Sequence, residues 1–144
     1  MKRVALAVFL ASASLAYADE SQLWIVATVR SYHMDRSSPY NERNYGPGIE
    51  YAINSRWSVA AGEYWNSSLR LSKYVAGSWT PVSLGAVRLG STAGVVTGYN
   101  RGHLAPLVAG VATIEGKRYG ANLLAIPPYD GGNWVLALQI KRRF

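Results

Sequence analysis

The sequence predicts an all-β protein, an eight-stranded antiparallel transmembrane β-barrel of the bacterial outer membrane. Three observations favour this fold: a C-terminal segment of alternating polarity that ends on an aromatic residue, an N-terminal export signal, and eight segments long enough to cross a membrane as strands. Cysteine is absent from the 144 residues, so disulfides do not hold this exported chain together. The closed hydrogen-bonded ladder of a barrel needs none.

The N-terminus has the features of a secretory signal peptide, residues 1–18. Lys2 and Arg3 precede an apolar stretch, and Ala16-Tyr17-Ala18 fits an A-x-A cleavage site. The apolar stretch is shorter than the roughly 20 residues that a membrane-spanning helix needs, and no later segment comes closer to that length. The mature chain, residues 19–144, is therefore expected to form one small domain, the barrel.

Eight segments of the mature chain are expected to be strands, since a spanning strand takes about 9–11 residues. These segments are 22–32, 45–53, 57–65, 71–80, 84–97, 104–113, 118–126 and 133–144. Three short connections, expected on the periplasmic side, lie at 54–56, 81–83 and 115–117. Four longer or more polar connections, expected outside, lie at 34–44, 66–70, 98–103 and 127–132.

Alternating polarity gives each predicted strand one face toward lipid and one toward the lumen. In the last strand only Arg142 breaks the alternation, near the periplasmic rim. The same parity points Glu50 and Arg88 into the lumen, where we expect them to pair, because a charge in a narrow barrel needs a partner or water. Glu63 falls on the lipid-facing parity of its strand, and a bulge or an early strand end there would remove the conflict.

Composition narrows the function classes. Fourteen glycines, ten tyrosines and five tryptophans suit a crowded lumen and two aromatic membrane interfaces. A soluble periplasmic β-sandwich is the alternative fold, but the aromatic C-terminus favours the barrel. Eight strands enclose too narrow a lumen for an open pore, which disfavours a porin. Removing the signal peptide lowers the net charge from +7 to +5, and the scattered basic residues disfavour nucleic-acid binding.

Several short motifs follow one another in an order typical of one enzyme family. They are Tyr32-His33, Tyr40-Asn41-Glu42-Arg43 with Gly46-Pro47-Gly48, and stretches at 57–68, 76–77, 92–95, 106–107, 125–127 and 131–133. Together they resemble the PagP family of lipid A palmitoyltransferases over nearly the whole mature chain. The resemblance implies an acyltransferase that moves a palmitoyl or similar chain from a glycerophospholipid to lipid A.

The resemblance also implies a catalytic set at the outer rim. His33 matches the active-site histidine of the family, and either Asn66-Ser67 or Ser67-Ser68 occupies the position of its Asp-Ser pair, so the aspartate is missing here. Neutral imidazole suits the base that takes a proton from the attacking hydroxyl, and Ser67 or Ser68 would donate to the oxyanion. A covalent acyl-serine is a further route, although the chain has no G-x-S-x-G elbow.

The missing aspartate leaves open which carboxylate orients the histidine. Asp35 and Glu42 in the first outer loop, or Asp130 in the last, are the candidates by proximity in the predicted topology. A purely structural role for His33 is the alternative, because a single histidine at a strand end is often an ordinary interface residue.

Prolines predict where the barrel wall is weakest, since a proline removes a donor from the strand ladder. Pro47 matches a family position beside one seam, and Pro106 with Pro127 matches the pair beside the opposite seam. In the family such seams admit lipid sideways. Ala76 and Ser78 correspond to the floor that measures the acyl chain, where a residue larger than glycine favours a shorter chain.

The resemblance implies a phospholipid donor and a lipid A acceptor in the outer membrane, with Arg43, Tyr40 and Arg70 binding substrate at the rim. Arginine suits phosphate geometry. Further cations expected at this rim are Arg36, Lys73 and Arg101. We expect a monomer that the barrel-assembly machinery inserts. No nucleic acid and no cofactor are expected. No metal is expected either, because His103 has no metal-ligand spacing to His33.

Two alternatives to acyl transfer remain. A non-catalytic small outer-membrane barrel, serving adhesion or membrane stability, would tolerate the loss of His33, Ser67 and Ser68. A lipid A deacylase would pair a serine with a histidine on one strand, and its H-x-S-x-G type of motif is not present in the sequence.

Overall fold

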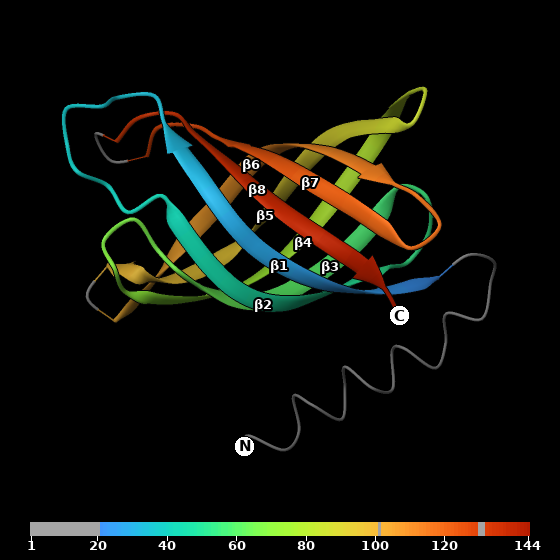
Figure 1. The fold of residues 1–144 in the computed structure, drawn as a ribbon, viewed down its shortest axis with the longest axis horizontal. Coiled ribbons are helices and arrows are strands. Elements are labelled where there is room, and N and C mark those ends of the chain that lie inside the picture. The colour runs from blue at the N-terminus through green and yellow to red at the C-terminus, as the bar shows by residue number, and fades with distance from the viewer. Residues whose placement is uncertain (1–20, 101, 130–131) are drawn as a thin grey trace, which may run out of the picture.

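The computed structural model describes residues 21–100, 102–129 and 132–144, so the expected signal peptide lies outside the described residues. Each strand pairs antiparallel with its neighbours in sequence, and β1 also pairs with β8, which closes the sheet into a barrel (Figure 1). The strands are β1 (Gln22–His33), β2 (Arg43–Ala52), β3 (Trp57–Trp65), β4 (Leu71–Leu84), β5 (Val87–Asn100), β6 (His103–Glu115), β7 (Tyr119–Ile126) and β8 (Val135–Arg143). The predicted eight-stranded antiparallel barrel is thus confirmed.

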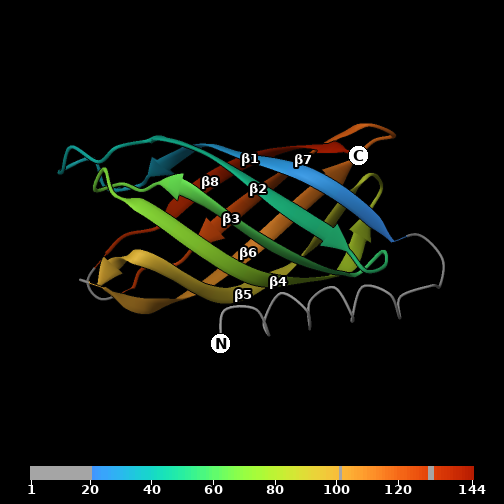
Figure 2. The ribbon, with the colours of Figure 1, turned by 90° about the horizontal axis from the view of Figure 1, so that it is seen from below.

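The connections gather at two ends of the barrel (Figures 1 and 2). Those that follow β1, β3, β5 and β7 lie at one end, which we call the outer end; their described residues are 34–42, 66–70, 102, 127–129 and 132–134. The other three connections and the C-terminus lie at the opposite, periplasmic end. No helix within the described part of the chain is long and apolar enough to cross a membrane.

The distribution of polar and apolar side chains is the reverse of that in a water-soluble barrel. Large apolar side chains stand exposed on the outside along every strand, for example Val75 and Val108, each more than half exposed. Buried polar and charged side chains fill much of the lumen, including Glu50, Asn122 and Lys141. A closed sheet with an apolar outer wall and a polar lumen is the arrangement that spans a bilayer, because closure leaves the sheet no free edge strand.

Aromatic side chains lie toward both ends of the outer wall. Trp57 and Trp79 are direct cross-strand partners near the periplasmic end and stack with ring centroids 5.9 Å apart. Further exposed aromatics near that end are Tyr119 and Phe144, and those near the outer end are Tyr32, Tyr45, Trp65 and Trp134. Two such belts match the two membrane interfaces.

The β4–β5 hairpin corrects one predicted turn. We expected a turn at 81–83, but β4 continues to Leu84 and the turn is Gly85-Ala86, with a positive φ of 62° at Gly85. Pro81 can lie in this strand because the β3–β4 ladder ends at the Trp57–Trp79 pair. No β3 residue pairs with Pro81, so the N–H that proline lacks is not required there. The hairpin therefore extends past its neighbours, as the yellow-green segment of Figure 1 shows.

Other strand boundaries also differ from the predicted ones. The expected 98–103 connection is mostly strand, since β5 and β6 continue to Asn100 and from His103, and β8 begins at Val135 and not at residue 133. The expected bulge at Glu63 is wrong. β3 pairs with β4 without interruption, and Glu63 lies directly opposite Lys73. Opposite charges on facing strands attract, so Glu63 is accommodated on the outer face.

Candidate functional site

A pocket of about 380 Å³ opens at the outer end of the barrel, where the 34–42 loop folds over the end of β1. Its lining comes from one continuous stretch of chain and includes both signs of charge. The lining residues are His33, Asp35, Arg36, Ser37, Ser38, Pro39, Tyr40 and Glu42. The predicted histidine therefore lines this pocket.

His33 is held by stacking and by its backbone. Its side chain is buried, and its ring stacks on Tyr40 with centroids 4.2 Å apart and an angle of 11° between the planes. Its backbone N–H donates to Oε1 of Glu42 at 3.0 Å, whereas its ring Nδ1 lies 3.6 Å from the same oxygen, too far for a hydrogen bond. Nδ1 has no hydrogen-bond partner among the described residues.

Glu42 is the carboxylate beside the histidine. The N–H of His33 that donates to it lowers the pKa of Glu42, and Arg36, whose Nη1 lies 2.6 Å from Oε1, lowers it further. Glu42 is therefore an anion at neutral pH, and its Oε1 lies 3.6 Å from the imidazole Nδ1.

The other two candidate carboxylates have different positions. Asp35 lines the same pocket, but its Oδ1 accepts the backbone N–H of Ser37 at 2.8 Å, which lowers the pKa of Asp35. Asp130 lies outside the described residues. Glu42 is thus the described carboxylate that the structure places against His33.

Asn66 serves the turn between β3 and β4. It is fully buried, and its Nδ2 donates to Ser72 Oγ at 2.9 Å and to the carbonyl of Gly98 at 3.2 Å. Its Oδ1 accepts the backbone N–H groups of Ser68 at 2.9 Å and Arg70 at 3.0 Å. With its side-chain donors and acceptor engaged in this way, Asn66 folds the turn in the manner usual for asparagine.

The two serines lie apart from the histidine pocket. Ser68 is exposed, and the carbonyl of Ser67 accepts the backbone N–H of Asn41 at 2.9 Å. Neither serine lines the pocket around His33, nor does Asn66. The structure therefore brings His33 together with Tyr40 and Glu42, and leaves the predicted oxyanion donors in the neighbouring turn.

Of the remaining predicted site residues, one lies in the pocket and the others lie elsewhere at the outer end of the barrel. Tyr40, predicted to bind substrate, packs on His33 inside the pocket. Arg43 and Arg70 are exposed, the first at the outer start of β2 and the second at the end of the turn. His103 is exposed at the start of β6. No group of three or more metal-ligating side chains lies close together among the described residues, and Arg101 lies outside them.

Pro47 lies where one ladder stops. The outermost β2–β3 pair is Gly48 with Gly62, so pairing ends directly beside Pro47. Farther out, the side chain of Asn44 replaces the ladder, because its Nδ2 donates to the carbonyl of Trp65 at 2.8 Å. A side-chain hydrogen bond thus spans the gap between β2 and β3.

The β6–β7 seam is wider. The outermost pair is Gly110 with Ala125, and Pro127 follows the end of β7. β6 continues outward to His103 with partners on β5 only, and Pro106 lies in this one-sided stretch. Pro47, Pro106 and Pro127 thus lie beside two places where a strand ladder stops short of the outer end.

The predicted acyl floor faces the lumen. Ala76 is buried, and Ser78 shares a hydrogen bond of 2.7 Å with Thr92. Both lie on the periplasmic side of Tyr74, whose hydroxyl accepts from Gln139 Nε2 at 3.3 Å. Tyr74 is on β4 and Gln139 on β8, opposite walls of the barrel, so this bond crosses the lumen above the expected floor.

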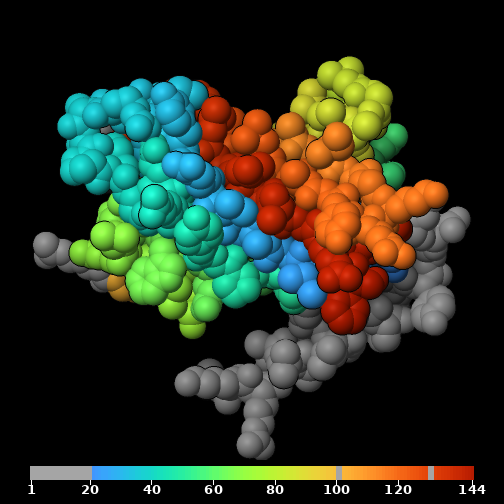
Figure 3. Space-filling model, in the orientation of Figure 1, coloured from blue at the N-terminus to red at the C-terminus, as the bar shows by residue number. Residues whose placement is uncertain are grey.

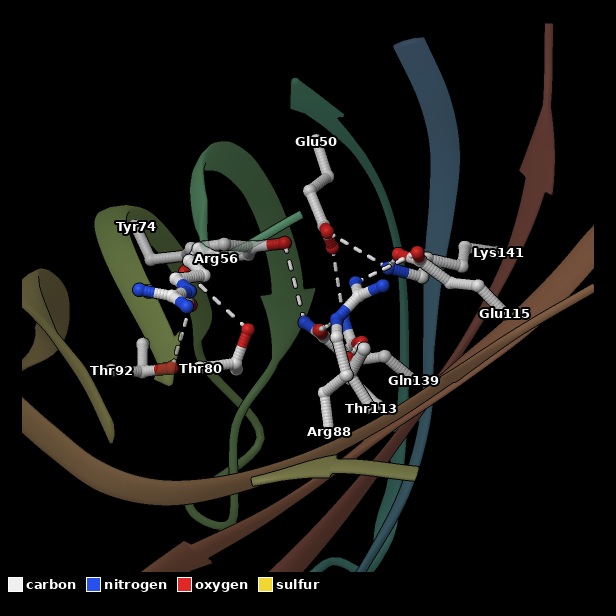
Figure 4. A network of polar contacts seen from close by, with 12 residues as sticks. Glu50, Arg56, Tyr74, Thr80, Arg88, Thr92, Thr113, Glu115, Gln139 and Lys141 are labelled. Atoms are coloured by element: carbon white, nitrogen blue, oxygen red, sulfur yellow. Dashed lines mark hydrogen bonds and ion pairs between the residues drawn. The ribbon is translucent and has the colours of Figure 1, made fainter. Parts of the chain in front are cut away.

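A charged network crosses the periplasmic half of the lumen (Figure 4). Lys141 has a fully buried side chain, and its Nζ lies 2.8 Å from Glu50 and 2.5 Å from Glu115. Arg88 lies 2.7 Å from Glu115, and Asn122 donates to Glu50 at 2.8 Å. The two cations and two anions balance, and together with Asn122 they join β2, β5, β6, β7 and β8.

This network corrects the expected Glu50–Arg88 pair. Both residues face the lumen as predicted, but Glu50 pairs with Lys141 and Arg88 pairs with Glu115. The expectation failed because we ended the sixth strand at Thr113, which placed Glu115 in a turn. In the structure β6 extends to Glu115, and that carboxylate points inward.

Little free volume remains beside the network. A cavity of about 20 Å³ lies among Glu50, Thr113 and Asn122. Such a space holds about one water molecule. At the level of the network the lumen is therefore packed. Seen from outside, the side chains of the front wall form a continuous surface (Figure 3).

The sequence matches no protein-family profile and no curated protein. Among solved structures it is similar to the N-terminal β-barrel domain of Pseudomonas aeruginosa OprF, with 13% identity, a TM-score of 0.57, and coverage of 87% of this chain and 100% of that one. It is also aligned with Yersinia pestis Ail, with 12% identity, a TM-score of 0.47, and the same coverage. The OprF likeness shows the fold. The apolar outer wall and polar lumen make this chain a small barrel of the bacterial outer membrane.

Proposed function

We propose that the protein is a non-catalytic barrel that stabilises the outer membrane. The observation that carries this proposal is the charged network of Lys141, Glu50, Glu115 and Arg88, which closes the lumen. A lumen filled in this way supports neither transport nor an acyl chain reaching below Tyr74. The same proposal includes a monomer inserted by the barrel-assembly machinery.

The outer end favours a role within the membrane over adhesion. The longest outer connection, residues 34–42, folds back on the barrel, where the N–H of Asn41 donates to Ser67 at 2.9 Å. The 66–70 connection has five residues and is held by the side chain of Asn66. Loops this short present little surface to another cell, while the exposed wall contacts lipid along the whole barrel.

An outer-membrane permeability assay tests this proposal. Cells that express the chain should take up less of a hydrophobic fluorescent dye, and survive EDTA and detergent better, than cells with an empty vector. The His33→Ala variant should protect equally, because a structural role does not use the imidazole. Equal dye uptake with and without the folded barrel would contradict the proposal.

Acyl transfer to lipid A is the second candidate, and the contact between His33 and Glu42 favours it. In that reaction His33 takes the proton of a lipid A hydroxyl group, and the hydroxyl oxygen attacks the ester carbonyl of a glycerophospholipid. The tetrahedral intermediate then expels the lysophospholipid oxygen, which recovers the proton from the imidazolium. A distance of 3.6 Å before substrate binds is compatible with this role, since such contacts often tighten in the complex.

Mass spectrometry of lipid A separates the candidates. The chain and its His33→Ala variant are expressed in cells that lack lipid A palmitoylation. The structural proposal expects an unchanged lipid A mass in both. A gain of one acyl chain that disappears in the variant would establish acyl transfer and refute the non-catalytic role, and a loss of mass would indicate deacylation.

A further inference from the structure

Two arginines face each other on the lipid side of the wall. Arg30 on β1 and Arg43 on β2 are direct cross-strand partners, and Arg30 is also paired with Leu138 on β8. Both arginines are exposed. Directly opposed residues have Cβ atoms roughly 5 Å apart, so two like charges stand side by side.

An irregularity in β1 turns Arg30 outward. Thr28 is buried and pairs with Gln139, which faces the lumen. In a regular strand Arg30 would share that face, because alternate side chains point the same way. The register shifts between Thr28 and Arg30 on both sides of β1, and Arg30 then pairs with Leu138, whose side chain is exposed on the outer wall. Bulges often re-aim a side chain in this way.

The two guanidinium groups have no anionic partner within the part of the chain that the structure describes. Neither forms an ion pair, and the carboxylate next to Arg43 in sequence, Glu42, is bound by Arg36 and by the N–H of His33. Exposed Tyr32 and Tyr45 flank the pair on the same wall. Tyrosine is enriched at the membrane interface, so the pair lies within reach of lipid head groups.

We propose that Arg30 and Arg43 together bind the phosphate of an anionic lipid in the outer leaflet, against the outside of β1 and β2. Long arginine side chains reach from an apolar wall to the head-group level, and their planar groups match phosphate oxygens in pairs. One phosphate relieves the repulsion between two adjacent cations. The site lies outside both the lumen and the His33 pocket, so it stands whichever of the two candidate functions holds.

Native mass spectrometry of the refolded barrel in zwitterionic micelles tests the site. The probe is lipid A carrying two phosphates, compared with the same lipid after enzymatic removal of its phosphates, and with inorganic phosphate alone. Arg30→Gln and Arg43→Gln should each weaken binding of the phosphorylated lipid about tenfold, the loss expected for a charge-assisted contact. Arg142→Gln, which removes an exposed arginine near the periplasmic end, is the matched control and should change binding less than about twofold.

Two results would overturn the proposal. One is equal binding of phosphorylated and dephosphorylated lipid, and the other is equal binding by the wild type and both glutamine variants. Tight binding of inorganic phosphate alone would show a free-anion site and refute the lipid assignment. The shift in electrophoretic mobility on heating confirms that each variant is folded, and Arg30→Lys, which keeps the charge but loses the paired geometry, supplies a second test should Arg30→Gln not fold.

Discussion

Replacing Lys141 by methionine tests whether the charged network holds the barrel together. Lys141 is fully buried and contacts both Glu50 at 2.8 Å and Glu115 at 2.5 Å. In the variant Glu115 keeps Arg88, but Glu50 keeps only the amide of Asn122. Removing one partner of a buried pair costs about 3–5 kcal/mol, because the other charge stays buried without compensation. We expect about 3 kcal/mol, since Asn122 still donates to Glu50.

Reversible urea unfolding in vesicles, followed by tryptophan fluorescence, measures the free energy of unfolding. The double variant Lys141→Met with Glu50→Gln should recover part of the loss, because the orphaned charge is gone. Arg143→Gln is the matched control on the same strand: its guanidinium is partly exposed and donates only to a loop carbonyl at 3.3 Å, so we expect less than about 1 kcal/mol. A loss below about 1 kcal/mol for Lys141→Met would refute the role assigned to the network.

Three further predictions concern a glycine in the barrel wall, the turn formed by Asn66 and the first outer loop. Gly94→Ala should destabilise the barrel by about 2 kcal/mol or more, because its Cβ would lie 2.0 Å from a strand carbonyl, whereas Gly77→Ala, with its nearest neighbour at 3.8 Å, should be nearly neutral in the same unfolding assay. Asn66→Ala should cost about 2–3 kcal/mol through lost buried hydrogen bonds, and the exposed Ser68→Ala less than about 0.5 kcal/mol; equal losses would contradict the turn-forming role. Because the pKa of Glu42 is lowered from 4.5, its stabilisation of the first loop is complete above that pH and lost as the pH falls through the lowered value. Hydrogen exchange of the backbone amide that donates to Glu42 measures this loss, and protection independent of pH would contradict it.

Much of the fold could be predicted because alternation in a barrel is strictly local. Each strand shows its two faces in its own sequence, and the polar face of β8, including Lys141, was visible before any partner was known. The errors arose where the partner strand decides the outcome. The local sequence predicts a turn at Pro81, but Pro81 lies in a strand beyond the end of the β3–β4 ladder. Glu63 needs no bulge because Lys73 lies opposite it.

The site was less predictable for the same reason. His33 and the carboxylate Glu42 lie nine residues apart in sequence, and only the path of the loop brings them within 3.6 Å. Nothing in the sequence distinguished Glu42 from Asp35 as the neighbour. The position of Asn66 suggested a catalytic pair through the family resemblance, whereas its four hydrogen bonds serve the turn.

These contacts decide which variant can test catalysis. Glu42 accepts the N–H of His33 and the guanidinium of Arg36, so replacing it would loosen the loop and lower activity for structural reasons alone. Among the described residues Nδ1 of His33 has no hydrogen-bond partner, and the ring stacks on Tyr40. His33→Ala therefore removes the imidazole while the bonds of the loop, which use its backbone, remain. An effect of this variant on lipid A with an unchanged unfolding free energy would consequently be chemical, and its absence would leave the closed barrel as the functional unit.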